Sequence, residues 1–205
     1  MTFYNILLLC AVISFVSSQG DIAEKFKTSE LVPDVIASPP GALLEVKYPS
    51  GVNVNLGNEL TPTNVKDIPS VTWEANPEHF YTLLLLDPDA PSRENPAIRS
   101  VRHWEVVNIP GNNLGEGETL MEYIGSGPAE ETKLHRYVFL LFKQTVGKGD
   151  FSAEPRACIK NIWHRVSFSA ALFIEKYSLD LVAGNFYQAQ YDDYVPILYT
   201  QFDPE

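Results

Sequence analysis

Two carboxylates stand in the segment best suited to binding chemistry. Asp87 and Asp89 belong to the run Asp87-Pro-Asp-Ala-Pro-Ser-Arg93, which directly follows an apolar stretch. Proline fixes φ and has no N–H, so this turn holds its carboxylates on a rigid backbone. Rigid loops at the ends of core strands often carry functional sites. The segment also fits an ordinary structural turn in which Asp89 and Arg93 form an ion pair.

Two histidines lie next to strand-like runs. His103 precedes the run Trp104–Ile109, and His135 precedes Arg136–Phe142. Because side chains alternate along a strand, His135 and Tyr137 are expected to point to the same face. Between these runs lies a glycine-rich stretch whose bare backbone amides can approach an anion closely. A histidine taken alone is more often a packed core residue than a ligand, so these histidines matter only together with their surroundings.

Several other kinds of chemistry lack a motif in this sequence. No His or Cys spacing is typical of zinc, and no glycine-rich phosphate loop or Gly-X-Ser-X-Gly elbow occurs. We therefore expect no metal and no cofactor. A hydrolase that uses Asp87, His103 and His135 as acid–base groups is an alternative, although no nucleophile is evident.

The elements that must position these residues read as a mostly β domain. Prolines punctuate residues 33–77, a pattern typical of many short strands joined by turns. A Pro-Ser-Gly turn should join the first two strands in a hairpin. The predicted strands cover residues 44–48, 52–56, 71–73, 80–86, 104–109, 136–142 and 182–188. The predicted helices cover residues 21–29, 168–177 with Ser167 as N-cap, and 194–202 after Asp192-Asp193.

The N-terminal residues and the charge bear on where the protein works. Residues 1–20 carry an apolar run followed by small residues, which predicts a signal peptide cleaved after Ser18 or Gly20. The run is too short to cross a bilayer, which needs about 20 apolar residues. Residues 21–205 would then form a single secreted domain, with Cys158 as its lone cysteine and no internal disulfide. A net charge of −11 disfavours general binding to nucleic acid or anionic membranes.

Several motifs in order along the chain resemble one known family. They are Asp87–Arg93, His103–Asn108, Gly125–Pro128 and His135–Tyr137. These segments are similar to the signature blocks of the phosphatidylethanolamine-binding protein family. Residues 60–66 and 187–196 match as well, so the resemblance runs from about residue 32 to residue 201. It looks closest to exported insect members.

This resemblance implies a fold and a pocket. The fold would be a large central antiparallel β-sheet packed on a smaller sheet, with short peripheral helices. The pocket would bind phosphate-like groups, including the head group of phosphatidylethanolamine, and Ala90–Pro91 would be a cis peptide. Imidazole, phenol and glycine N–H groups would donate to the anion, while Asp87 would orient an imidazole or pair with a ligand amine. Matched motif by motif, the pocket residues would be Asp87, Ala90, Pro91, His103, Gly127, Pro128, His135, Tyr137 and Tyr199.

The implied function is non-enzymatic binding and regulation outside the cell. The expected partner is a phospholipid head group or another phosphate-bearing small molecule, and some family members inhibit kinases or proteases, which makes a serine protease a further candidate. No nucleic acid and no transmembrane segment are expected. Carriage of small hydrophobic odorants is another alternative, but it would need an apolar cavity of roughly 300 Å³ or more.

Overall fold

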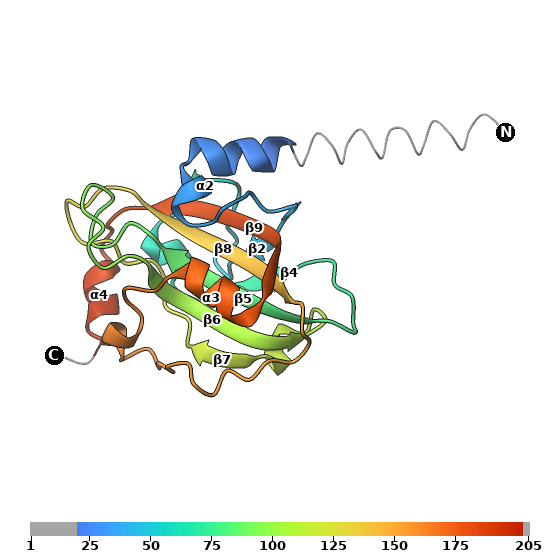
Figure 1. Cartoon of the computed structure of the whole chain (residues 1–205). Coiled ribbons are helices and arrows are strands. Elements are labelled where there is room, and N and C mark those ends of the chain that lie inside the picture. Colours follow the sequence, from blue (N-terminus) through green and yellow to red (C-terminus); the bar gives the residue numbers. More distant parts are fainter. Residues whose placement is uncertain (1–19, 203–205) are drawn as a thin grey trace, which may run out of the picture.

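The computed structural model describes residues 20–202, and a mixed β-sheet forms its centre (Figure 1). Within these residues the strand order is β1-β9-β8-β5-β6-β7, and β3 also pairs with β9. A separate two-stranded antiparallel sheet is formed by β2 (Glu45–Lys47) and β4 (Ser70–Thr72). The strands of the large sheet are β1 (Ala42–Leu43), β3 (Asn58–Glu59), β5 (Phe80–Asp87), β6 (Val101–Pro110), β7 (Glu118–Met121), β8 (His135–Gln144) and β9 (Leu179–Ala189).

The predicted mostly-β fold with a large and a small sheet is confirmed, with one difference. Strands β5 to β9 pair antiparallel, as expected, whereas the short strands β1 and β3 run parallel to β9. A hairpin turn joins antiparallel strands, and neither short strand is joined to β9 by such a turn, so parallel pairing is possible. The predicted signal peptide, residues 1–20, lies outside the described residues except for its last position.

The hairpin predicted from residues 44–48 and 52–56 forms only in part, between residues 46–48 and 52–54. The N–H of Tyr48 donates to the carbonyl of Val52 at 2.9 Å, and that of Val54 donates to Val46 at 3.0 Å. The regular partner of β2 is instead β4. Residues 52–56 do not continue as a strand, because the backbone turns at Leu56, where φ is 46° and the N–H donates to the Asn185 side chain.

Alternating side chains of the central strands build two apolar clusters, one on each face of the large sheet. On β8, Tyr137 and Phe139 belong to one cluster, whereas Val138 and Leu140 belong to the other. The prediction that β5 is buried on both faces is confirmed, because all but its first residue are buried. Each fully buried large apolar side chain contributes about 1.5–3 kcal/mol, so these strands form a rigid base for the loops at their ends.

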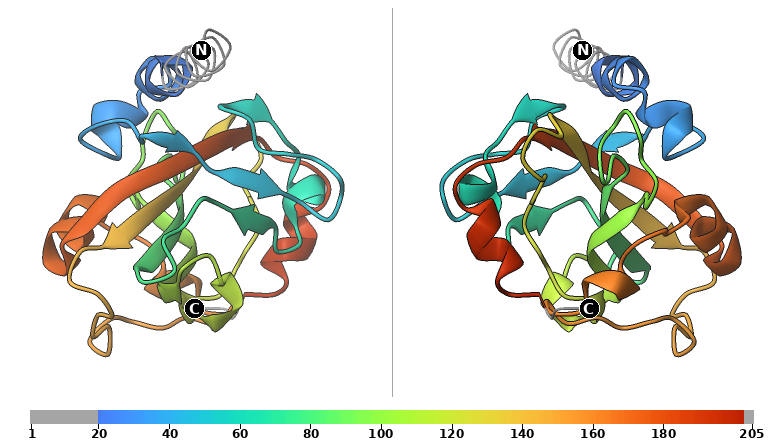
Figure 2. Two further views of the ribbon diagram at one scale, coloured as in Figure 1. Left: turned by 90° about the vertical axis from the view of Figure 1, so that its right-hand side faces the viewer. Right: turned by 90° about the vertical axis from the view of Figure 1, so that its left-hand side faces the viewer.

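Few helices surround the sheets. The helix that includes residues 20–28 confirms the predicted N-terminal helix and buries Ile22 and Phe26 against the sheet. The N-cap of α3 is Ser169 and not the predicted Ser167. Ser169 has an extended backbone, and its side chain accepts from the Leu172 N–H at 3.3 Å. Ser167 instead has a φ of 56°. Figure 2 shows α4 in red, well away from the blue N-terminal helix. The helices are α2 (Leu31–Asp34), α3 (Ala170–Tyr177), α4 (Val195–Tyr199) and the 3-10 turns at Pro62–Val65, Leu114–Glu116 and Ile162–His164.

Helix α4 lies inside the range predicted for a C-terminal helix, and Asp192 accepts from the Tyr194 N–H at 2.9 Å just before it. None of the helices within residues 20–202 has the length and apolar character needed to cross a membrane.

Candidate functional site

A cavity of about 570 Å³ opens where β5 ends and where β6 and β8 begin. Because β6 and β8 both run antiparallel to β5, their first residues lie at the same end of the sheet as the last residues of β5. Asp87, His103, His135 and Tyr137 therefore converge, as the sequence analysis expected. Of the predicted pocket residues, only Pro128 is absent from the lining. It is buried next to Gly127, which does line the cavity.

The acidic turn holds one side of this cavity. The Asp89 N–H donates to Asp87 Oδ1 at 2.7 Å, so the first carboxylate fixes the turn that follows it. The bond between Ala90 and Pro91 is cis, as the resemblance implied, and both residues line the cavity. This turn places the Asp87 carboxylate, which is 4 % exposed, at the cavity wall.

Asp87 orients the imidazole of His135, in agreement with the role expected for it. The His135 Nδ1 lies 2.9 Å from Asp87 Oδ2, and its Nε2 lies 3.1 Å from the hydroxyl of Thr132. Thr132 donates its single hydroxyl hydrogen to the carbonyl of Ala129 at 2.7 Å. With that hydrogen committed, the contact between Thr132 and His135 requires a hydrogen on the imidazole. The two contacts together fix the orientation of the ring between Asp87 and Thr132.

His103 is bonded differently. Its Nδ1 lies 3.1 Å from the carbonyl oxygens of both Ile124 and Gly125, so this nitrogen must carry the hydrogen. Burial lowers the pKa of His103, although the carboxylate of Asp87 acts in the opposite direction. The ring is therefore neutral at neutral pH and leaves Nε2 as an acceptor. This differs from the expectation that both imidazoles donate to an anion.

Two tyrosines complete the polar end. The Tyr137 ring stacks on Tyr187 with centroids 5.1 Å apart and meets His103 edge-on at the same distance. Burial raises the pKa of Tyr137 well above its usual value, so its hydroxyl stays protonated. Tyr199, on α4, donates to the carbonyl of Gly127 at 2.8 Å, which fixes α4 against the glycine segment.

The rest of the wall is apolar and was not singled out from the sequence. Trp163 is the most exposed of these residues, at 54 %. They come from the loop before β6 and its first residue, the segment after β7, the turn at residues 162–166 and the C-terminal segment, and no spacing rule links such distant positions. Only a structure or a family alignment could have grouped them. The apolar lining residues are Ile98, Val101, Ile124, Ile162, Trp163, Val166, Leu198 and Phe202.

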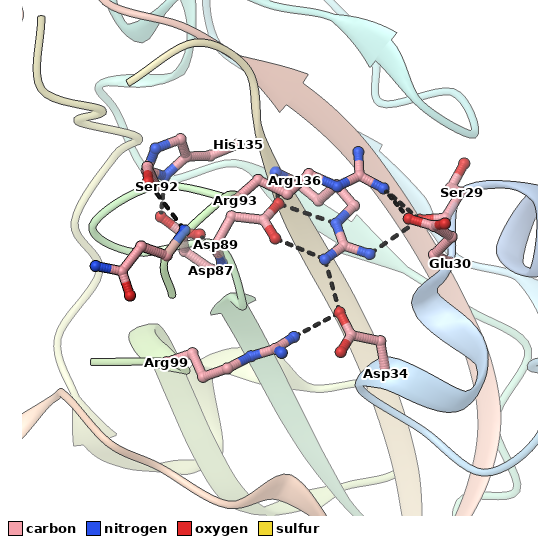
Figure 3. A network of polar contacts seen from close by, with 11 residues as sticks. Ser29, Glu30, Asp34, Asp87, Asp89, Ser92, Arg93, Arg99, His135 and Arg136 are labelled. Atoms are coloured by element: carbon pink, nitrogen blue, oxygen red, sulfur yellow. Dashed lines mark hydrogen bonds and ion pairs between the residues drawn. The ribbon is translucent and has the colours of Figure 1, made fainter. Parts of the chain in front are cut away.

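A charged network lies behind the acidic turn (Figure 3). The guanidinium of Arg136 donates to both oxygens of Asp89 at 2.9 and 2.6 Å, and to Asp34 at 2.7 Å. Arg93 pairs instead with Glu30 at 2.7 Å. The alternative in which Asp89 pairs with Arg93 is therefore wrong. On β8, His135 faces the cavity while the next residue faces this network, as strand alternation requires.

The sequence profile of the family described as "Phosphatidylethanolamine-binding protein" matches residues 50–186. The chain belongs to the phosphatidylethanolamine-binding protein family. Its relatives include "Putative odorant-binding protein A5" of Drosophila melanogaster, 37% identical over 196 residues that cover 94% of this chain and 92% of the relative. The "26 kDa secreted antigen" of Toxocara canis is 40% identical over 166 residues, 80% of this chain and 63% of the antigen.

Solved structures of other proteins share the fold. A crystal structure of carboxypeptidase Y inhibitor complexed with its cognate proteinase superimposes with a TM-score of 0.71 and 26% identity, covering 85% of this chain and 97% of the inhibitor. The solution structure of CG7054 gives a TM-score of 0.69 and 42% identity, covering 85% of this chain and 99% of that protein.

Within residues 20–202 no cluster of three or more His, Cys, Asp or Glu could hold a metal ion.

Proposed function

We propose that this protein is a secreted, non-enzymatic binding protein that holds a small amphipathic molecule in the cavity. The observation that supports this most strongly is the division of the cavity into a polar end and an apolar wall. A phosphate-type head group, such as that of phosphatidylethanolamine, would occupy the polar end. The apolar part of the ligand would lie along the wall that includes Trp163 and Val166.

The polar end can recognise a zwitterionic head group better than a bare dianion. The Tyr137 hydroxyl can donate a hydrogen bond to a phosphate oxygen, whereas the Asp87 carboxylate would repel a dianion and attract an ammonium group. Phosphorylethanolamine carries both kinds of group, which makes it a suitable probe.

A binding role is favoured over the hydrolase alternative. Asp87, His103 and His135 could transfer protons, but nucleophilic catalysis also needs an activated nucleophile that faces the substrate. The hydroxyl of Thr132 lies 3.1 Å from His135 Nε2, yet it donates to the carbonyl of Ala129 and does not line the cavity. Ser126 stands closest in sequence to the cavity glycines, yet it is fully buried and does not line the cavity. The exposed thiol of Cys158 does not line it either.

Inhibition of a protease is a second candidate, supported by the similarity to an inhibitor bound to its proteinase. We keep the expectation of a serine protease as the target class. Incubation of the protein with serine proteases and measurement of residual activity tests this candidate separately from ligand binding.

Carriage of hydrophobic odorants is a third candidate, and the cavity favours it more than the sequence did. The volume of about 570 Å³ exceeds the roughly 300 Å³ that such a role needs, and most lining residues are apolar. The name of the Drosophila relative points the same way.

Secretion is supported by the names of both relatives. Expression in insect cells, followed by mass spectrometry of the medium, tests it. We expect a mature chain that begins after Ser18 or Gly20.

Calorimetric titration with phosphorylethanolamine tests the binding proposal. His135→Ala should weaken binding about ten- to a hundred-fold, because it leaves the buried Asp87 carboxylate without its imidazole partner, and a hydrogen bond to a charged group is worth roughly 1.5–3 kcal/mol. His79→Ala removes a histidine that does not line the cavity and should leave affinity unchanged. Equal affinity of the wild type and His135→Ala would place the ligand elsewhere, and no binding to the wild type would contradict the proposal.

A further inference from the structure

We infer that the head group of the ligand donates a hydrogen bond to Nε2 of His103, so that the cavity selects molecules with an O–H or N–H at the head over isosteric molecules without one. This inference rests on the proposed binding function and names the chemistry that the same site requires. It concerns the direction of one hydrogen bond, which the protein has fixed before any ligand arrives.

The first step is the orientation of the imidazole. Carbonyl oxygens offer only lone pairs, and two of them, from Ile124 and Gly125, lie 3.1 Å from Nδ1 of His103. The hydrogen of the neutral ring must therefore sit on Nδ1. The two carbonyls belong to the backbone that follows β7, so side-chain rotation cannot remove them.

The second step is that Nε2 lacks a donor from the protein. No described residue donates to it, although His103 is only 6 % exposed and lines the cavity. A molecule that fills the cavity excludes water from Nε2. Because an acceptor without water and without a partner is unfavourable, the bound molecule itself must donate a hydrogen bond to Nε2.

The third step is that the other groups at the polar end are also rich in acceptors. Asp87 is a carboxylate, and Tyr199 uses its hydroxyl hydrogen on the carbonyl of Gly127. Both ring nitrogens of His135 already have partners in the protein, Asp87 and Thr132. Two exposed acids, Glu130 and Glu131, follow the cavity residue Ala129 along the chain. Apart from the Tyr137 hydroxyl, lone pairs and negative charge therefore dominate the side chains at this end, which disfavours a fully deprotonated anion.

The fourth step is the size of the apolar wall. The cavity is far larger than a head group alone, so a bound molecule can extend along Ile98, Val101 and Val166. Each additional buried methylene should raise affinity about fourfold until the wall is covered. Two sources of the required hydrogen fit this shape: the hydroxyl of an aliphatic alcohol, and the P–OH of a singly protonated phosphate monoester.

Matched pairs of ligands test the inference. Octan-1-ol and 1-methoxyheptane have equal numbers of heavy atoms, but only the alcohol can donate. Hexyl phosphate and pentyl methyl phosphate form the corresponding phosphate pair, again with equal numbers of heavy atoms. By calorimetry the wild-type protein should bind the donating member of at least one pair about tenfold or more tightly, and the preferred pair identifies the source.

The variant His103→Phe should lose this preference, whereas His79→Phe should keep it. Because His103→Phe also removes the donor to two buried carbonyls and could fail to fold, a second measurement uses the unmodified protein. Long-range ¹H–¹⁵N spectra of the histidine rings should show His103 with hydrogen on Nδ1 and a bare Nε2, whose resonance shifts when the donating ligand is added.

Two outcomes would overturn the inference alone: equal affinities within both pairs while phosphorylethanolamine still binds, or a spectrum with the hydrogen on Nε2. Failure of every probe, phosphorylethanolamine included, would overturn the proposed function as well.

Discussion

His103 and His135 stand at the same cavity but are held by different partners. One nitrogen of His135 meets the carboxylate of Asp87, and the other meets the hydroxyl of Thr132. His103 meets two carbonyls on one nitrogen and no donor on the other. Their placement at strand ends, together with the family resemblance, predicted that both would reach the site. Neither could predict the direction of each hydrogen bond, because the partners are backbone atoms and a threonine hydroxyl.

Gly125 is needed at this site because other backbone approaches it closely. A Cβ at this position would lie 2.7 Å from the carbonyl oxygen of Val65 and 3.1 Å from Cα of Lys66, and neither atom belongs to a flexible side chain. We expect Gly125→Ala to lower the free energy of unfolding by about 1–3 kcal/mol and to displace an acceptor of His103.

Urea denaturation measures this change, and Gly115→Ala is the matched control. A Cβ at Gly115 would meet its nearest neighbour, Asn113 Oδ1, only at 3.8 Å. Equal stability of the two alanine variants would contradict the prediction.

At the scale of elements, β8 and β2 show what strand periodicity can and cannot establish. Alternation along β8 correctly assigned His135 and Tyr137 to one face. The turn residues around Pro49 correctly marked a chain reversal, but the partner of β2 proved to be β4, which is distant in sequence. Apolar patterns locate strands, whereas pairing depends on contacts that a single sequence does not reveal. The parallel pairing of β1 and β3 with β9 and the apolar cavity wall escaped prediction for the same reason.

Strand β6 also carries a buried acid that makes stability depend on pH. Burial raises the pKa of Glu105 to about 7, although Arg102, 2.9 Å away, favours the charged form. A carboxyl whose folded pKa lies above its unfolded value contributes most to stability when it is protonated. That contribution is lost as pH rises from about 4.5 through 7.

Glu105→Gln removes this titration. We expect the unfolding free energy of the variant, relative to the wild type, to rise by about 2–3 kcal/mol between pH 4.5 and pH 8. Urea denaturation of both proteins across this range measures the difference, from which the contribution of His103 cancels. A constant difference would show that the pKa of Glu105 is not raised.

At the scale of the whole molecule, the N-terminal segment is joined to the cavity by charge. Arg136 links Asp34 and the carbonyl of Ser29 to Asp89, whose N–H in turn holds Asp87 at the cavity wall (Figure 3). The segment also buries apolar residues against the sheet. Ser29 and Asp34 lie about a hundred positions before Arg136 in the chain, so the sequence alone does not connect this segment with the site. Binding at the cavity and docking of this segment should therefore favour each other, because coupling between two sites is reciprocal.

Asp34→Asn tests this coupling. Hydrogen bonds from Arg99 and Arg136 lower the pKa of Asp34 despite its partial burial, so the carboxylate is charged at neutral pH and holds both guanidinium groups. In the wild type, phosphorylethanolamine should slow amide hydrogen exchange in residues 20–36. In Asp34→Asn the slowing should be smaller and the affinity roughly fivefold weaker. Glu30→Gln is the control, because it removes only the exposed pair with Arg93 and should behave like the wild type. Unchanged affinity and exchange in Asp34→Asn would mean that the segment packs on the fold without influencing the cavity.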